Sequence, residues 1–92
     1  MFLLKITVKP AAASEEKMTQ HQQWFKQYFD AGKFKIVGPF VDIKNAGVII
    51  AQVDTKDEMK EIISHDAFYP ASADYDLQEF KAKLVANNIT SE

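Results

Sequence analysis

The sequence contains no cysteine and no arginine, and each absence excludes a kind of chemistry. Without cysteine the chain cannot form disulfides, thiol nucleophiles, iron–sulfur clusters or cysteine-ligated zinc sites, and we expect a cytoplasmic protein. All 11 cationic residues are lysine, so the planar group that binds phosphate or carboxylate through two parallel hydrogen bonds is missing. The net charge of −2 leaves no basic surface, so we expect no nucleic-acid partner.

Long apolar runs are also missing, so we expect no membrane span. Lys5 and Lys9 interrupt the apolar start of the chain before it reaches the length of a signal-peptide core. Hydrophobic residues make up 47% of the sequence and aromatic residues 12%, which is enough for a packed core. The chain of 92 residues is too short for a second core, so we expect a single domain over residues 1–92.

Hydrophobic periodicity and capping residues predict four strands and two helices. The strand patterns cover residues 2–9, 34–43, 48–53 and 75–80, with a turn at 45–47. Ser14 can cap a first helix, which Gly32 would end. Thr55 and Glu58 form a T-x-x-E capping box that opens a second helix. Residues 81–92 are a polar C-terminal extension, which we expect to be either a short additional helix or a segment that binds a partner.

The order strand–helix–strand–strand–helix–strand predicts an α+β fold. With right-handed crossovers it becomes a ferredoxin-like βαββαβ arrangement, an antiparallel sheet with both helices on one face. We expect the opposite face to be apolar, because Val37, Val41 and Ile43 add to half of the 48–53 run. A monomer would expose an unusually large apolar patch there, so we expect a homodimer whose sheets pack face to face.

One histidine lies on the apolar side of the first predicted helix. At 100° per residue, His21 falls within the same stripe as Phe25 and therefore faces the sheet. A buried histidine needs a hydrogen-bond partner, and Asp66, three residues after Ile63, can supply one if the second helix continues past Ser64. A carboxylate that keeps one imidazole nitrogen protonated leaves the other free to act as a base.

Other interpretations of these residues remain open. On spacing alone, a purely structural pair of core residues is favoured over a catalytic pair. We expect any ligand to bind between helices and sheet, against aromatic walls formed by Trp24, Tyr28 and Phe68. A metal site is not expected, because the chain has two histidines and no cysteine. No phosphate-binding glycine motif occurs, and no cofactor is expected. No serine lies in a nucleophile elbow.

Several segments together resemble the YCII-related family. They span most of residues 1–80 and are His21-Gln22-Gln23-Trp24-Phe25, Ala31-Gly32-Lys33-Phe34, Gly38-Pro39-Phe40, Val48-Ile49-Ile50, the helix 55–64 and Asp66-Ala67-Phe68. The resemblance implies the dimeric α+β barrel group, in which ferredoxin-like protomers pair through their sheets. It also implies an active-site dyad of His21 and Asp66, and a dehydrochlorinase of chlorinated hydroquinones belongs to this family.

Two functions follow as hypotheses. The first is a cofactor-independent enzyme, lyase-like or isomerase-like, in which His21 and Asp66 transfer a proton during elimination or isomerisation of a small cyclic or enolic substrate. The second is a non-catalytic dimeric module that binds a small molecule or a partner protein in the same pocket. A His21 that lines a cavity favours the first hypothesis, and a His21 sealed in the core without a cavity favours the second.

Overall fold

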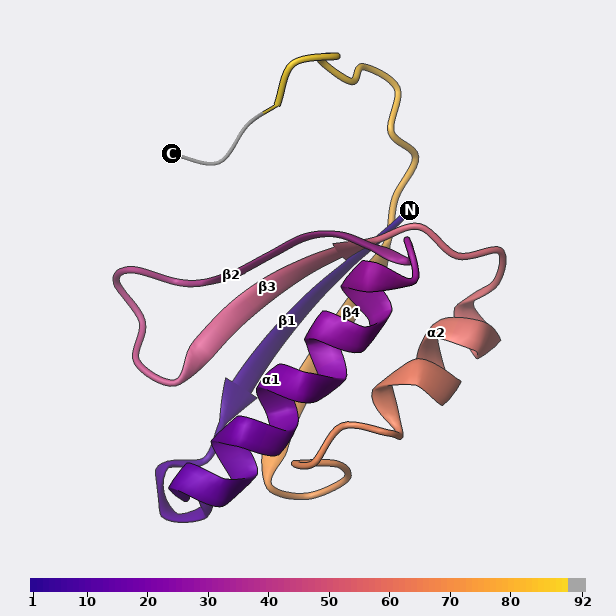
Figure 1. Cartoon of the computed structure of the whole chain (residues 1–92). Coiled ribbons are helices and arrows are strands. Elements are labelled where there is room, and N and C mark those ends of the chain that lie inside the picture. Colours follow the sequence, from indigo (N-terminus) through magenta and orange to yellow (C-terminus); the bar gives the residue numbers. More distant parts are fainter. Residues whose placement is uncertain (90–92) are drawn as a thin grey trace.

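The computed structural model describes residues 1–89 and shows a four-stranded sheet covered on one face by two helices (Figure 1). In chain order the elements are β1 (Phe2–Val8), the short 3-10 helix η1 (Pro10–Ala12), α1 (Glu15–Asp30), β2 (Phe34–Pro39), β3 (Ala46–Ala51), α2 (Lys56–Ile63) and β4 (Ala73–Glu79). The strand order is β2-β3-β1-β4, and every pairing is antiparallel. The predicted α+β, ferredoxin-like fold is confirmed.

Capping groups determine where α1 begins and ends, as the sequence predicts. The side chain of Ser14 accepts a hydrogen bond from the backbone N–H of Lys17 at 3.2 Å. After the helix, Gly32 adopts φ 80°, and its N–H bonds to the carbonyl of Phe29 while that of the next residue bonds to Tyr28. This pair of bonds is a Schellman motif, which requires the left-handed conformation that glycine adopts without steric cost.

The predicted capping box of α2 forms only in part. The side chain of Thr55 accepts a hydrogen bond from the N–H of Glu58 at 3.1 Å. The Glu58 carboxylate instead binds the Nζ of Lys33 at 2.6 Å. The start of α2 is therefore tied to the segment that follows α1, and this ion pair raises the pKa of Lys33 and lowers that of Glu58.

The core lies between the sheet and the two helices. Alternate side chains of β1 point toward the helices and are buried, as the predicted alternation requires. The largest side chains that are completely buried are Phe2, Phe34, Phe68, Leu4 and Met59. The indole Nε1 of Trp24 donates to the carbonyl of Ile62 at 2.9 Å, which joins α1 directly to α2. The core thus fixes the position of both helices on one sheet face.

Strand β2 is shorter than predicted, because the chain leaves the sheet after Pro39 rather than after residue 43. Asn45 adopts the left-handed conformation, with φ 55°, and returns the chain into β3 at Ala46. Val41 and Ile43 therefore belong to the loop between the two strands and are exposed. Their predicted place on the sheet face is wrong.

The predicted orientation of Val37 is also wrong. A β-bulge between Phe34 and Ile36 shifts the register of β2 by one residue. Val37 therefore pairs with Ile49, whose side chain is buried on the helix side. A one-residue shift moves all following side chains of a strand to the other face, so Val37 points toward the helices.

The sheet face opposite the helices is apolar over one half only. Its apolar side chains come from β1, β2 and β3 and are Leu3, Ile36, Val48 and Ile50. Leu3 is 38% exposed and Ile36 is 43% exposed. The other half belongs to β4 and carries the exposed side chains of Asp74, Asp76 and Gln78. The predicted apolar face is thus limited to the half formed by β2, β3 and the start of β1.

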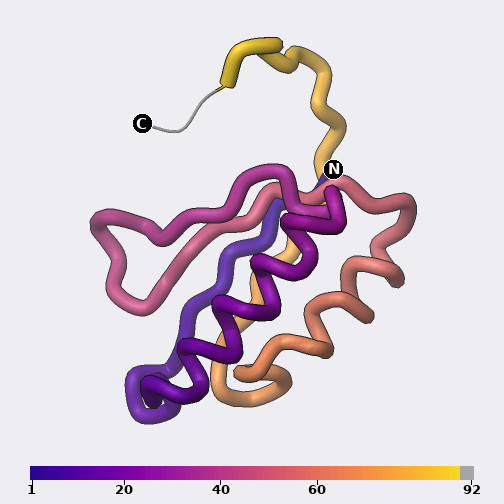
Figure 2. Tube along the Cα trace, viewed as in Figure 1, coloured from indigo at the N-terminus to yellow at the C-terminus, as the bar shows by residue number. Residues whose placement is uncertain are grey.

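Beyond β4 the chain leaves the sheet, and residues 81–89 form neither helix nor strand (Figure 2). Leu84 in this segment is 98% exposed. The short additional helix considered for residues 81–92 is absent from residues 81–89, and residues 90–92 lie outside the described part of the chain. Within residues 1–89, no helix is both long enough and apolar enough to cross a membrane.

Candidate active site

The two residues predicted as a dyad meet in the interior of the molecule. The Nδ1 of His21 and the Oδ1 of Asp66 are 2.6 Å apart. The Asp66 side chain has no exposed surface, and His21 is 9% exposed. Asp66 lies beyond the end of α2, in a turn where its N–H bonds to the carbonyl of Ile63 at 3.0 Å. A turn, rather than the predicted continuation of the helix, therefore brings the carboxylate to the histidine.

The second nitrogen of the His21 ring is accessible from outside. Its Nε2 makes no hydrogen bond to residues 1–89, while every buried side-chain nitrogen and oxygen of that part of the chain has a partner. Nε2 is therefore in contact with solvent. Because the Asp66 carboxylate accepts a hydrogen bond from Nδ1–H, the lone pair of the neutral imidazole lies on Nε2. A base with this arrangement can take a proton from a bound molecule.

A third polar residue, Tyr75, completes the pair. Its hydroxyl donates to the Oδ2 of Asp66 at 2.6 Å, so both carboxylate oxygens accept a short hydrogen bond. Burial, and then the hydrogen bond to Asp66, raise the pKa of Tyr75. The sequence analysis placed this residue in a strand but gave it no role. Its inward position depends on the pairing of β4 with β1, where it lies opposite the inward-facing Ile6, and periodicity alone does not reveal it.

Aromatic rings surround the imidazole of His21. The ring centroids of Trp24, Phe25 and Phe68 lie 5.6, 5.4 and 5.2 Å from it. Trp24 and Phe68 are buried. Tyr28 lies farther along α1, where its hydroxyl is 3.1 Å from the Nδ1 of His65. The structure thus brings Trp24 and Phe68, but not Tyr28, against the dyad.

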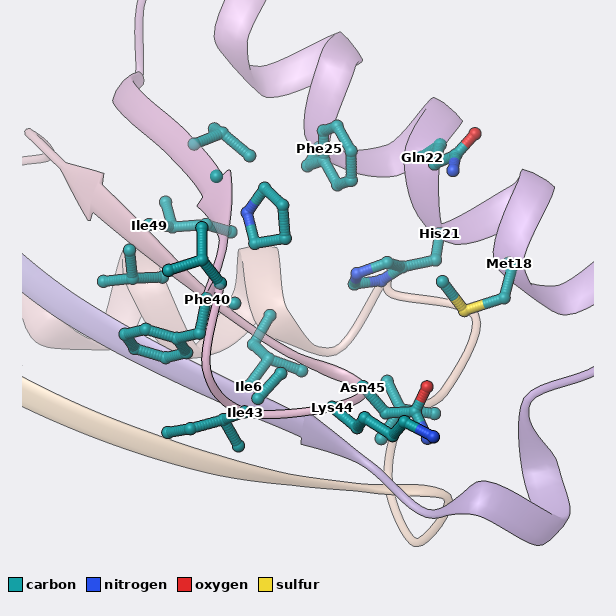
Figure 3. Close-up of a pocket in the computed structure, with 18 of the residues that line it drawn as sticks. Ile6, Met18, His21, Gln22, Phe25, Phe40, Ile43, Lys44, Asn45 and Ile49 are labelled. Atoms are coloured by element: carbon teal, nitrogen blue, oxygen red, sulfur yellow. The ribbon is translucent and has the colours of Figure 1, made fainter.

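An open cavity of about 1130 Å³ lies between α1 and the hairpin of β2 and β3 (Figure 3). His21 and Phe25 project from α1 into this space. The apolar residues of the wall include Ile6, Val8, Val37, Phe40, Ile43 and Ile49. Polar residues of the lining are Gln22, Lys26, Asp30, Asp42, Lys44 and Asn45. A largely apolar wall with one accessible base is typical of a small-molecule site.

The cavity wall differs from the aromatic wall that the sequence suggested. Trp24, Tyr28 and Phe68 do not line the cavity, and contact between these residues and a ligand stays a prediction. Phe25 could have been assigned to the wall, because it follows His21 by four residues on the same side of the helix. Val37 could not, because its orientation depends on the β-bulge.

The donor groups of the site are few. Among residues 1–89, no three histidine, cysteine, aspartate or glutamate side chains are grouped as a metal ion would require. Lys26, at the cavity, is paired with Asp30 at 2.9 Å. What the arrangement offers a bound molecule is an oriented imidazole in largely apolar surroundings, with Gln22, Lys44 and Asn45 as further polar groups of the lining.

Comparisons with known proteins agree with this fold. The family model of the YCII-related domain matches residues 1–81. The structure of 5-chloro-2-hydroxyhydroquinone dehydrochlorinase from Burkholderia phenoliruptrix, in complex with 2,5-dihydroxybenzoquinone, is similar with a TM-score of 0.68 and 15% sequence identity. The similarity covers 88% of this chain and 94% of that one, and it shows a common fold. No curated protein matches this sequence. Since the family model matches residues 1–81, most of the chain, the chain belongs to the YCII-related family.

Proposed function

We propose that this protein is a cofactor-independent enzyme that uses His21 as a general base and Asp66 to orient it. The observation that carries the proposal is the 2.6 Å contact between Nδ1 and the buried carboxylate, together with an Nε2 that is accessible at an apolar cavity. A histidine sealed in the core would support the binding-module hypothesis instead. The buried Asp66 stabilises the imidazolium that forms when His21 accepts a proton.

The proposed reaction is an elimination or an isomerisation. His21 Nε2 takes a proton from an O–H or C–H bond of the substrate, and the electron pair of that bond moves into the substrate. In an elimination, a leaving group such as chloride departs with its own bonding pair, and His21 later releases the proton to water. In an isomerisation, His21 returns the proton to a different atom. Neither the elimination nor the isomerisation requires an oxidant or a reductant.

The cavity favours a small cyclic substrate with few charges. Its wall is mostly aliphatic and aromatic, the cation of Lys26 is paired with Asp30, and the remaining charged residues of the lining, Asp42 and Lys44, have opposite signs. The structurally similar protein is a dehydrochlorinase of a chlorinated hydroxyhydroquinone, and its structure holds a dihydroxybenzoquinone. Chlorinated hydroquinones are therefore the first compounds to test, followed by enolic lactones and diketones.

The test combines turnover with substitutions of both histidines. The protein is incubated with 5-chloro-2-hydroxyhydroquinone and related phenols, and chloride release and absorbance are followed. His21→Ala should lower kcat by about 10²–10⁴-fold, as expected for a lost general base. His65→Ala is the matched control, because His65 is more exposed and bonds to Tyr28 outside the cavity lining. This control should retain activity.

The same protein samples distinguish the enzyme hypothesis from the binding-module hypothesis. Ligand binding is followed through the fluorescence of Trp24, whose ring stacks on His21. Binding of these compounds without turnover, equal in wild type and His21→Ala, would contradict the proposed enzyme and support a non-catalytic binding module.

We also propose that two copies pair through the apolar half of the sheet face that Leu3, Ile36, Val48 and Ile50 form. These side chains adjoin one another on the sheet instead of being scattered over the surface, and burial of such a patch against a second copy is favourable. Light scattering should give twice the mass of one chain. Ile36→Asp should shift the protein to the monomer, because a charge buried in an interface is unfavourable. Gln78→Asp, on the polar half of the same face, is the control. A wild-type monomer at micromolar concentration would refute the pairing.

A further inference from the structure

We propose that Tyr75 is a positioning residue of this site, which acts on His21 through Asp66 by holding the carboxylate in one orientation. The catalytic consequence rests on the proposed function, whereas the hydrogen-bond relay from Tyr75 to His21 is independent of it. The relay joins three parts of the chain, namely β4, the turn after α2, and α1.

The geometry gives each carboxylate oxygen a separate donor. Tyr75 binds Oδ2 at 2.6 Å and His21 binds Oδ1 at 2.6 Å. A carboxylate held through one oxygen can rotate about its bond to Cβ, and the hydrogen bond to the imidazole then loses its alignment. Two donors on opposite oxygens fix the plane of the group. Tyr75 does not line the cavity, so it would act without touching the substrate.

The hydroxyl of Tyr75 stays a donor over the whole neutral range. Burial, and then the bond to Asp66, raise the pKa of Tyr75. Asp66 itself is completely enclosed, and burial of a charged group is unfavourable unless its hydrogen bonds are satisfied, as they are on both oxygens here. An ionised Asp66 keeps the proton of the pair on Nδ1 and leaves Nε2 available as the base.

Other polar groups near the dyad do not replace Tyr75. Tyr69 packs its ring against Tyr75 at 5.9 Å between centroids, but its hydroxyl makes no bond to Asp66 within residues 1–89. The Nζ of Lys17 binds the carbonyl of Ala67 at 3.1 Å. The charged residues that share the cavity with His21 are Lys26, Asp30, Asp42 and Lys44.

The experiment compares Tyr75→Phe with Tyr69→Phe, because each variant removes one hydroxyl and keeps the ring. Nitrogen-15 NMR of His21 reports which ring nitrogen carries the proton, and proton NMR detects the Nδ1–H resonance and its exchange with water. In Tyr75→Phe we expect faster exchange of Nδ1–H and a larger population with the proton on Nε2. In Tyr69→Phe both readouts should match the wild type.

A double variant tests whether the effect passes through Asp66. If Tyr75 acts only by orienting the carboxylate, adding Tyr75→Phe to Asp66→Ala, which removes both carboxylate oxygens, should change the His21 spectra no further. On a turned-over substrate, Tyr75→Phe should lower kcat about 10-fold, the ratio that one hydrogen bond to a charged group supports, with KM unchanged.

The two proposals fail in different ways. A Tyr75→Phe protein that folds and gives the wild-type His21 spectra would overturn the positioning role, whatever its activity. The same conclusion follows if Tyr75→Phe alters the spectra equally with and without Asp66. A coupled Tyr75–Asp66–His21 relay in a protein that turns over none of the tested compounds would leave the positioning of His21 in place and contradict the proposed enzyme.

Discussion

At the scale of single residues, the most demanding feature is the buried carboxylate of Asp66. Its two hydrogen-bond partners come from two different elements, α1 and β4, and its side chain is shielded from water. Burial of a charge is unfavourable unless its hydrogen bonds are satisfied, and here both oxygens are. Loss of this buried polar network should therefore lower the free energy of unfolding as well as the proposed activity.

Removal of this carboxylate should destabilise the fold strongly. Asp66→Ala leaves the Nδ1–H of His21 and the hydroxyl of Tyr75 without their partner, and loss of one member of a buried pair costs about 3–5 kcal/mol. Asp66→Asn keeps an acceptor and should cost less. Urea unfolding at pH 7 measures both values, with the exposed Asp74→Ala as control. A loss below about 1 kcal/mol in Asp66→Ala would show that the network adds little to stability.

At the scale of secondary-structure elements, local signals predicted the helices better than the hairpin. Ser14, Gly32 and Thr55 act within a few residues of their own position, so their capping roles could be read from the sequence. The β-bulge that turns Val37 inward depends on pairing between two strands. The left-handed conformation of Asn45, which shortens β2, likewise depends on how the hairpin closes.

In the candidate site too, the features set by local sequence were predictable and those set by strand pairing were not. The position of His21 follows from helical periodicity, which is local. Asp66 was predicted as its partner from a continuation of α2, but a turn after the helix brings Asp66 inward instead. The role of Tyr75 and the cavity wall depend on the sheet register and on contacts between distant elements, which periodicity does not contain.

The ion pair between the two helical regions should make stability depend on acidity. The hydrogen bond from Lys33 lowers the pKa of Glu58 in the folded chain, so ionised Glu58 favours folding. This contribution is complete above the ordinary pKa of glutamate, about 4.3, and is lost as the pH falls through the lower folded value. Glu58→Gln should therefore show a shallower loss of stability below about pH 4.

Urea unfolding of both proteins between about pH 2 and about pH 7, a range that spans the ordinary titration of carboxylates, measures this difference. The exposed Glu79→Gln serves as control. Parallel curves for wild type and Glu58→Gln would show that the pair between Lys33 and Glu58 does not contribute to folding.

At the scale of the whole molecule, the fold is complete before the C-terminal extension begins. The sheet ends with β4 at Glu79, and the N–H of Phe80 bonds to the carbonyl of Met1. Residues 81–89 form no helix or strand and expose their apolar side chains. The segment therefore contributes little to the core.

A chain that ends at Phe80 should keep its stability. Since residues 81–89 add no element to the sheet, we expect a change within about 0.5 kcal/mol in urea unfolding. The His21 NMR spectra should also be unchanged, because the dyad lies among earlier residues. A truncated chain that unfolds or loses the Nδ1–H resonance would show that the extension supports the core.

In the proposed enzyme, the loop between β2 and β3 affects substrate selectivity separately from the chemistry. It is anchored at its ends by backbone hydrogen bonds, from the N–H of Phe40 to Ala46 and from the N–H of Val8 to Asn45. Its side chains form one wall of the cavity, while the relay from Tyr75 to His21 is built from other parts of the chain. Substitutions at 41–44 can therefore change which compound fits without altering the base. In the proposed enzyme, the same proton-transfer centre can therefore serve different substrates.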